Sequence, residues 1–298
     1  MTPFSLDLVS SMPKKILVQL DCDPQPSTFD AVVGVDAGAD VLLRHGGVTP
    51  ETVEPLVHGA MFTRGGADLA STAIFVGGSD VAAAEAVADR VRRTFFGPVR
   101  VGVLVDPNGA NTTAAAAVIA TARHVALDDR CRAVVLGGTG PVGQRVARLL
   151  AGKGVRVTLA SRSPDRAAAV ARRIEAAVAG STVHPVGADG LLGSALAAAD
   201  VIVAAGAAGV TLLDAAGRRR ATAARVVVDL NAVPPAGIEG VVATDKARPD
   251  GPAVLYGALG VGGTKMKIHK AAIRRIFSDP TAFLDAEDLL AIGTAEAT

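Results

Sequence analysis

The sequence has few of the residues that mark several large classes of protein. It contains no tryptophan and only 3% aromatic residues, and two cysteines, Cys22 and Cys131, are too few for a disulfide framework. No apolar run reaches the roughly 18 residues of a membrane span, and residues 1–13 lack the basic and apolar segments of a secretory signal. We therefore expect a soluble, cytoplasmic protein.

Charge and metal-ligating residues exclude further classes. A net charge of +1 offers no electrostatic footprint for nucleic acid or a membrane surface. The five histidines are scattered, without a spacing suited to zinc, so we expect no metal centre. No Gly-x-Ser-x-Gly turn is present, and nothing marks a catalytic triad. The reaction, if there is one, must proceed without an obvious acid–base pair.

What the chain does have is aliphatic side chains and a regular alternation of strands and helices. Hydrophobic residues make up 50% of 298 residues, enough for two domains with cores of Ala, Val, Leu and Ile. Strands are predicted at residues 16–20, 41–43, 72–76, 99–105, 133–136, 155–159, 201–205 and 226–228. Helices are expected after Ser27 or Thr28, at Thr49-Pro50 and after Asp80 and Asn111, with Leu127–Arg130 as the domain linker. Repeated βα units predict an α/β fold with parallel sheets.

The most informative stretch begins with the strand at residues 133–136. This strand runs into a glycine-rich turn and then into a helix, the context in which Gly-x-Gly-x-x-Gly indicates a dinucleotide site. The first glycine allows the turn, the second allows a pyrophosphate to approach, and the third allows helix and strand to pack. The turn consists of Gly138, Thr139, Gly140, Pro141, Val142 and Gly143. We expect phosphate oxygens to meet the unpaired N–H groups of the helix.

The end of the next strand indicates which dinucleotide binds. An NAD enzyme places an acid there to bind the ribose, whereas this chain has Ser161, Arg162 and Ser163. Arg162, helped by Arg166, is suited to a 2′-phosphate, which favours NADP. The alternative is that Arg162 is a surface residue and Asp165 binds the ribose of NAD. Ala205, Gly206 and Asn231 follow later strands and are expected on the cofactor side of the sheet.

A late glycine-rich stretch, residues 257–270, is the least easily explained by structure alone. We interpret it as a mobile loop leading into a helix whose first turns carry Lys265, Lys267 and Lys270. Cations near a helix N-terminus are disfavoured by about 0.3–1 kcal/mol each. Either an anionic or electron-rich ligand offsets that cost, or the lysines are tolerated on the surface.

Several motifs together resemble one family. They are the runs at residues 14–23 and 27–30, Thr63–Gly66, Ser71–Gly78, Phe95–Pro98, Asp106–Thr113, Gly138–Gly143, Asp229–Asn231 and Gly257–Lys265. In these residues the chain resembles the NADP-dependent methylene-tetrahydromethanopterin dehydrogenases of methylotrophic bacteria. The resemblance implies a pterin substrate domain (residues 14–126 plus 265–298), a Rossmann-like NADP domain (residues 127–264) and a homo-oligomer, a trimer or a hexamer.

The resemblance also implies a site for the reduced pterin between the domains. It places Phe29 near the pterin and brings Lys265 into the cleft, and it makes Asn111 and Thr112 candidates for substrate binding. Asp21, Asp23 and Asp106 end strands of the substrate domain, so we expect at least one to bind the pterin ring or to offset positive charge. Each is otherwise a turn residue or helix cap. Residues 1–11 are expected to have no catalytic role.

Two other functions stay open. One is a methylene-tetrahydrofolate dehydrogenase of the bifunctional folate type, which would need a catalytic lysine in the N-terminal domain. Residues 16–125 contain no lysine, so Lys265 would have to substitute. The other is a non-catalytic NADPH-binding sensor.

Overall fold

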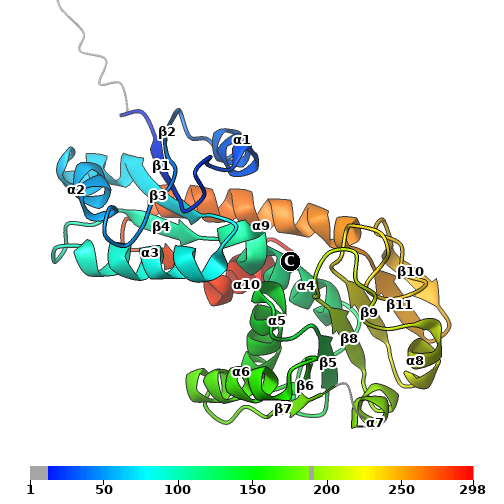
Figure 1. Ribbon diagram of the computed structural model, residues 1–298. Helices are drawn as coiled ribbons and strands as arrows, with labels where there is room; N and C mark the ends of the chain where they lie inside the picture. Colours follow the sequence, from blue (N-terminus) through cyan, green and yellow to red (C-terminus); the bar gives the residue numbers. More distant parts are fainter. Residues whose placement is uncertain (1–12, 188–190, 298) are drawn as a thin grey trace, which may run out of the picture.

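The computed structural model describes residues 13–187 and 191–297, which form two α/β domains joined by long helices (Figure 1). The expected α/β architecture with a Rossmann-like second domain is confirmed. In the described part of the chain, no helix is long and apolar enough to cross a membrane. The expectation about residues 1–11 concerns residues outside the described part.

The first domain is built on a five-stranded sheet in the order β12-β4-β3-β1-β2. All four neighbouring pairs are parallel. Its strands are β1 (Ile16–Asp21), β2 (Val41–His45), β3 (Thr72–Gly77), β4 (Gly102–Val105) and β12 (Phe283–Leu284). Its helices are α1 (Thr28–Asp36), α2 (Glu54–Phe62) and α3 (Val81–Thr94), with 3₁₀ turns at Gly66–Ser71 and Pro107–Gly109. The carboxyl ends of β1, β3 and β4 lie at one edge of the sheet, because parallel strands end together.

The second domain has a seven-stranded sheet in the order β10-β11-β9-β8-β5-β6-β7. Its strands are β5 (Arg132–Leu136), β6 (Arg156–Ala160), β7 (Val183–Val186), β8 (Val201–Ala204), β9 (Val226–Asp229), β10 (Lys246–Asp250) and β11 (Ala253–Tyr256). Its helices are α5 (Pro141–Gly152), α6 (Pro164–Ala177), α7 (Leu191–Ala197) and α8 (Ala215–Arg220). Apart from β10 this is the strand order of dinucleotide-binding folds, whose ligand site lies where the order reverses, here between β5 and β8.

Three helices pack on one another where the two domains meet: α4 (Ala110–Ala122), α9 (Ala258–Ser278) and α10 (Ala286–Ala295). Figure 1 shows α4 near the centre of the molecule and α9 running from the first domain to β10 and β11. Nearly every residue of α4 is buried, and the helix packs on α5, α9 and α10. Its run of alanines lets these helices approach closely. One continuous core therefore includes β3, α4 and β5.

The structure corrects several predicted elements. The helix expected at Thr49-Pro50 begins at Glu54, because residues 50–53 form turns. The strand predicted from residue 99 begins at Gly102. Strands β7, β10, β11 and β12 were not predicted, and β10 is antiparallel to β11, so the second sheet is not wholly parallel. β7 and β10 contain proline, and β12 has only two residues, so their sequences carry a weak strand signal.

The prediction of a mobile loop at residues 257–264 is wrong. These residues form the first turns of α9, which begins at Ala258. Gly257 and Gly260 lie so close to the backbone of residues 242–245 that a Cβ on either would collide with it. Lys265 therefore lies inside the helix and not at its start, and the predicted domain boundary at residues 264/265 falls within this one helix.

Candidate active site

The glycine turn lies at the point where the second sheet reverses its strand order. Gly137 has a positive φ of 69°, and a Cβ there would come within 2.8 Å of Gly206 Cα at the end of β8. A Cβ on Gly143 would lie 2.5 Å from Gly137 O. Turn, helix and neighbouring strand thus pack with no room for side chains. The turn spans residues 137–140 and is closed by a hydrogen bond from Gly140 N to Gly137 O at 3.0 Å; Gly138 lies inside it, where a Cβ would collide with Leu159.

The residues around this turn fit a dinucleotide. Helix α5 begins at Pro141, and no side chain in the described part of the chain caps its first N–H groups, which leaves them available to an anion. A cavity of about 510 Å³ lies in front of the turn and is lined by residues after β5, β6 and β8. Thr139 Oγ1 and Ser161 Oγ lie 3.1 Å apart at its wall, and the guanidinium-bearing Arg162 and Arg166 line the same cavity. Backbone donors and two cations suit a pyrophosphate and an additional phosphate.

The structure brings together most, but not all, of the predicted cofactor residues. Those that line the cavity are Thr139, Gly140, Pro141, Ser161, Arg162, Arg166, Ala205 and Gly206. Those outside its lining are Gly138, Val142, Gly143, Ser163 and Asn231. Ser163 caps α6 by accepting a hydrogen bond from Arg166 N, and Asn231 bonds within its own loop to Val233 and Pro235. These two side chains organise the loops beside the cavity.

A second pocket, of about 330 Å³, lies at the carboxyl ends of the strands of the first domain. It is lined by Asp23, Ser27, Phe29, Asp30, Gly78, Ser79, Asn108, Gly109 and Lys265. Phe29 is 53% exposed, although it begins a helix that packs on the sheet. Asn108 and Gly109 both have positive φ, which turns the chain sharply below Lys265. A Cβ on Gly109 would collide with Lys265 Nζ, so a larger residue there would displace the ammonium from this place.

Two of the predicted aspartates support this pocket from below. Asp21 is fully buried and accepts hydrogen bonds from Asp23 N and Ser27 N, both at 2.9 Å. Asp106 is also fully buried and accepts hydrogen bonds from Asn111 N at 2.9 Å and from Thr112 Oγ1 at 2.6 Å. Neither lines the pocket. Their carboxylates hold the turns that carry the pocket's lining.

The other predicted substrate residues divide in the same way. Asp23 lines the pocket, where Ser79 holds it through hydrogen bonds from Oγ at 2.8 Å and from N at 3.0 Å. Asn111 and Thr112 are buried in the first turn of α4 and do not line it. Both residues bond to Asp106, and their part in substrate binding stays a prediction.

Asp30 and Lys265 give the pocket its electrostatic character. Burial raises the pKa of Asp30 to about 6; the Ser27 hydroxyl opposes that rise, Asp106 adds to it, and Lys265 opposes it. One turn beyond Lys265, His269 is fully buried and stacks on Phe75 with 5.6 Å between ring centres. Burial lowers the pKa of His269, so it is neutral at neutral pH. The pocket therefore contains one lysine and two carboxylates, with no second cation from His269.

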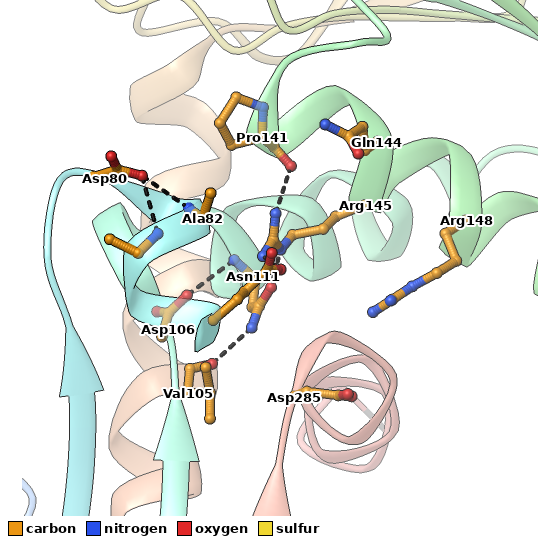
Figure 2. Close-up of polar contacts among 12 residues, drawn as sticks. Asp80, Ala82, Val105, Asp106, Asn111, Pro141, Gln144, Arg145, Arg148 and Asp285 are labelled. Carbon is orange, nitrogen blue, oxygen red and sulfur yellow. Dashed lines mark hydrogen bonds and ion pairs between the residues drawn. The ribbon is translucent and has the colours of Figure 1, made fainter. Parts of the chain in front are cut away.

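Arg145 connects this pocket to the dinucleotide cavity. Its guanidinium donates to Pro141 O at 2.9 Å, to Asn111 Oδ1, and to Glu85 Oε1 at 2.5 Å. Pro141 lines the dinucleotide cavity, and Asn111 follows the turn that lines the second pocket. Figure 2 shows Arg145 reaching from α5 toward Asn111, and Asn111 bonded in turn to Asp106 and Val105. The two pockets thus share one buried polar network.

Sequence reasoning missed Asp30 and Arg145. Asp30 stands directly after Phe29, and a helix-start aspartate is so common that nothing distinguishes it. Arg145 lies on the buried face of α5, among Val146 and Leu149, and is only 7% exposed. A charged residue on an apolar helix face was the available signal, because a buried arginine requires partners.

Comparisons with known proteins agree with this arrangement. Residues 28–108 match the family model "Methylene-tetrahydromethanopterin dehydrogenase, N-terminal", and residues 120–247 match the model "Shikimate / quinate 5-dehydrogenase". Two relatives come from Methylorubrum extorquens. "Bifunctional protein MdtA" is 44% identical over 93% of this chain and 97% of the relative. "NAD(P)-dependent methylenetetrahydromethanopterin dehydrogenase" is 35% identical over 89% of this chain and 92% of the relative.

Solved structures share the fold at low identity. The 5-ketofructose reductase of Gluconobacter sp. strain CHM43 is 15% identical, covers 95% of this chain and 99% of its own, and has a TM-score of 0.56. The quinate dehydrogenase of Corynebacterium glutamicum, solved with NAD, is 17% identical, covers 95% and 99%, and has a TM-score of 0.51. These likenesses show a shared two-domain α/β fold and nothing about the substrate.

Proposed function

The chain belongs to the methylene-tetrahydromethanopterin dehydrogenase family, and from this premise we propose that it is an NAD(P)-dependent enzyme that oxidises the methylene bridge of N5,N10-methylene-tetrahydromethanopterin to the methenyl form. One observation carries the proposal. A cavity fitted to a dinucleotide and a pocket with carboxylates, a lysine and an aromatic ring lie at the carboxyl ends of the two sheets and share the Arg145 network.

The residues of the pocket suit a reaction in which no proton moves. The bound nicotinamide supplies the acceptor for the hydride. The substrate carbon loses a hydride and becomes a cation whose charge is shared by the lone pairs of N5 and N10. The protein has to orient the substrate and exclude water. No histidine is among the described residues that line the second pocket, in keeping with chemistry that needs no general base.

We assign the orienting contacts to Asp30 and Phe29. An ionised Asp30 can accept hydrogen bonds from the amide and amino groups of a pterin ring, and the exposed face of Phe29 can stack on it. Lys265 can donate to the ring's carbonyl and nitrogen acceptors. Asp30 lowers the cost of placing this ammonium near a developing cation, because opposite charges partly cancel. Asp23 adds a second carboxylate at the same pocket.

We also propose that NADP is preferred to NAD. Arg162 and Arg166 line the dinucleotide cavity at the end of β6, where an NAD site has an acid. Asp165 lies in the first turn of α6 and is exposed, and it is not among the residues that line the cavity. This arrangement favours a 2′-phosphate over a free ribose hydroxyl.

A further part of the proposal concerns assembly and location. We propose a homo-oligomer, a trimer or a hexamer, in the cytoplasm. The exposed apolar side chains Val32, Val35 and Leu43 lie on α1 and the edge strand β2, a face suited to a second copy. Cys22 and Cys131 are free thiols, as expected in a reducing compartment. Analytical ultracentrifugation with a Val35→Glu variant tests the interface, and a monomeric wild-type protein would contradict it.

The function is tested by following absorbance at 340 nm with NADP and methylene-tetrahydromethanopterin. We expect NADPH to form, and we expect methylene-tetrahydrofolate, which carries the same bridge between two nitrogens, to react at the same site. The ratio of kcat/KM for the two substrates identifies the preferred pterin. Protein that binds NADPH but oxidises neither compound would instead be a sensor, and the proposal would be wrong.

A further inference from the structure

Arg145 is a charged residue buried between the domains. It lies on α5, the helix whose first turn faces the dinucleotide cavity, and its side chain reaches Asn111 on α4. Burying a guanidinium is costly unless its N–H groups are bonded. The carbonyl of Pro141, the amide oxygen of Asn111 and the carboxylate of Glu85 provide those bonds.

Two of the three partners of Arg145 belong to different parts of the site. Pro141 is the first residue of α5 and lines the dinucleotide cavity. Asn111 donates through Nδ2 to Val105 O at 2.6 Å, and its backbone N donates to Asp106. This pair of bonds fixes the turn at residues 106–110, which includes Asn108 and Gly109 of the second pocket. The chain of contacts therefore runs from the start of α5 to the base of the second pocket.

A neighbouring arginine shows that this route is particular to Arg145. Arg148 lies on the same helix, and its Nη2 donates to Glu287 Oε2 of α10 at 2.7 Å. Figure 2 shows Arg148 reaching toward α10, the helix that Asp285 caps. Both arginines join α5 to elements outside the second domain, and of the two it is Arg145 that bonds to Asn111, the residue that follows the turn below the second pocket.

We propose that Arg145 is a positioning residue: it sets the place of the start of α5, and with it the dinucleotide, relative to the turn 106–110 under the substrate pocket. Hydride transfer is sensitive to small displacements of the two reacting carbons, because misplacement by about 1 Å can cost roughly a hundredfold in rate. One side chain bonded to both sites keeps this spacing. The inference rests on the proposed function for its substrate, but the coupling between the two sites does not depend on which pterin binds.

Hydrogen–deuterium exchange of the protein with and without NADP tests the coupling directly. In the wild type we expect NADP to slow amide exchange both at residues 137–143 and at residues 106–112. In Arg145→Met, protection at residues 137–143 should remain and protection at residues 106–112 should be lost. The control Arg148→Met should keep both. The inference is overturned, whatever the substrate, if NADP still protects residues 106–112 in Arg145→Met. It is also overturned if NADP does not protect residues 106–112 in the wild type.

Kinetics provide the second test. Arg145→Met should slow hydride transfer in single turnovers at least tenfold, with a Kd for NADPH within threefold of the wild type. With a substrate deuterated at the methylene carbon, the isotope effect on hydride transfer in Arg145→Met should depend more strongly on temperature than the isotope effect in the wild type or in Arg148→Met. Equal losses in both variants would show a merely structural role and overturn the inference. If Arg145→Met does not fold, Arg145→Lys, which keeps a cation near Glu85, takes its place in both tests.

The two tests separate the two proposals. A wild-type protein that oxidises no methylene-pterin but shows the exchange coupling refutes the function and leaves the role of Arg145 standing. An active wild type whose exchange at residues 106–112 ignores NADP refutes the role of Arg145 alone.

Discussion

The ammonium of Lys265 lies 5.9 Å from the centre of the Phe29 ring, across the pocket at the carboxyl end of the first sheet. At this distance cation and ring attract weakly, which holds the lysine over the pocket rather than in solvent. The two residues come from opposite ends of the chain, and Gly109 leaves the space in which Nζ lies. This relationship is the basis of the first prediction.

Replacing Lys265 by methionine should lower turnover at least tenfold, about 1.4 kcal/mol of transition-state stabilisation, because the substitution keeps most of the volume and removes the donor. NADP affinity should change little, since Lys265 does not line the dinucleotide cavity. Steady-state kinetics and NADPH fluorescence titration measure the two effects. Lys267→Met, on an exposed position of the same helix, is the control. Near wild-type turnover in Lys265→Met would return this lysine to a surface role.

Asp30 should give the enzyme an acid limit. Its pKa is raised to about 6, mainly by burial, and only the ionised form accepts two pterin donors. We expect kcat/KM for the pterin to rise with pH through about 6 and then level off. Asp30→Asn should abolish that step and lower the plateau at least tenfold, about 1.4 kcal/mol. Asp36→Asn, on the same helix but paired with Lys270, should retain the wild-type profile.

The same carboxyl has a predicted effect on stability, with a definite sign. Because the folded-state pKa lies above the value of 3.8 in the unfolded chain, the folded protein holds the proton more tightly. The contribution of Asp30 to stability is complete below about pH 4 and is lost as the pH rises through 6. Relative to the wild type, Asp30→Asn should therefore gain stability between pH 4 and 7. Urea unfolding at several pH values measures this, and a parallel pH dependence of both proteins would contradict it.

Arg162 is predicted to select the cofactor. Arg162→Ala should raise the KM for NADP far more than the KM for NAD. The loss of one charged hydrogen bond should weaken NADP binding by about 1.5–3 kcal/mol. The measurement is kcat/KM with each cofactor at saturating pterin. Arg172→Ala, on an exposed position of α6 outside the cavity, is the matched control. An equal change with both cofactors would assign Arg162 to the surface.

The parts of the site that depend on local sequence could be predicted. The strand before the glycine turn, the helix after it and the basic residues at the end of β6 are contiguous signals, and eight of the predicted cofactor residues line the dinucleotide cavity. The aspartates at strand ends were found for the same reason. Sequence alone did not show which of these carboxylates face the pocket and which accept hydrogen bonds from the protein itself. That depends on Ser27, Asn111 and Thr112, which donate hydrogen bonds to them in the folded chain.

The parts that depend on distant contacts could not be predicted. The glycines of residues 257–263 indicate a flexible loop by composition, yet the segment is helical because two of them pack against the backbone of residues 242–245. Arg145 meets Asn111 and Glu85 across 34 and 60 positions of sequence. Nothing near Arg145 in the chain identifies these partners.

Two further glycines of α9, Gly262 and Gly263, have no packing reason for being glycine. Apart from the helix's own backbone, a Cβ on either would meet no atom of the described residues within 4 Å, and glycine inside a helix costs about 1 kcal/mol relative to alanine. Gly262 is half-buried and lies one turn before Lys265 on the same face of the helix, whereas Gly263 is exposed. We therefore expect Gly262 to keep space open for the ligands beside Lys265, and Gly263 to have no such role.

The two glycines provide a matched test of this role. Gly262→Ala and Gly263→Ala should both raise the melting temperature, since each adds a better helix former in open space. Gly262→Leu should raise the pterin KM or lower kcat at least tenfold, about 1.4 kcal/mol, while Gly263→Leu leaves both parameters within twofold. Differential scanning calorimetry and steady-state kinetics on the four variants measure these effects. If Gly262→Leu were as active as Gly263→Leu, the open space before Lys265 would not be part of the binding site.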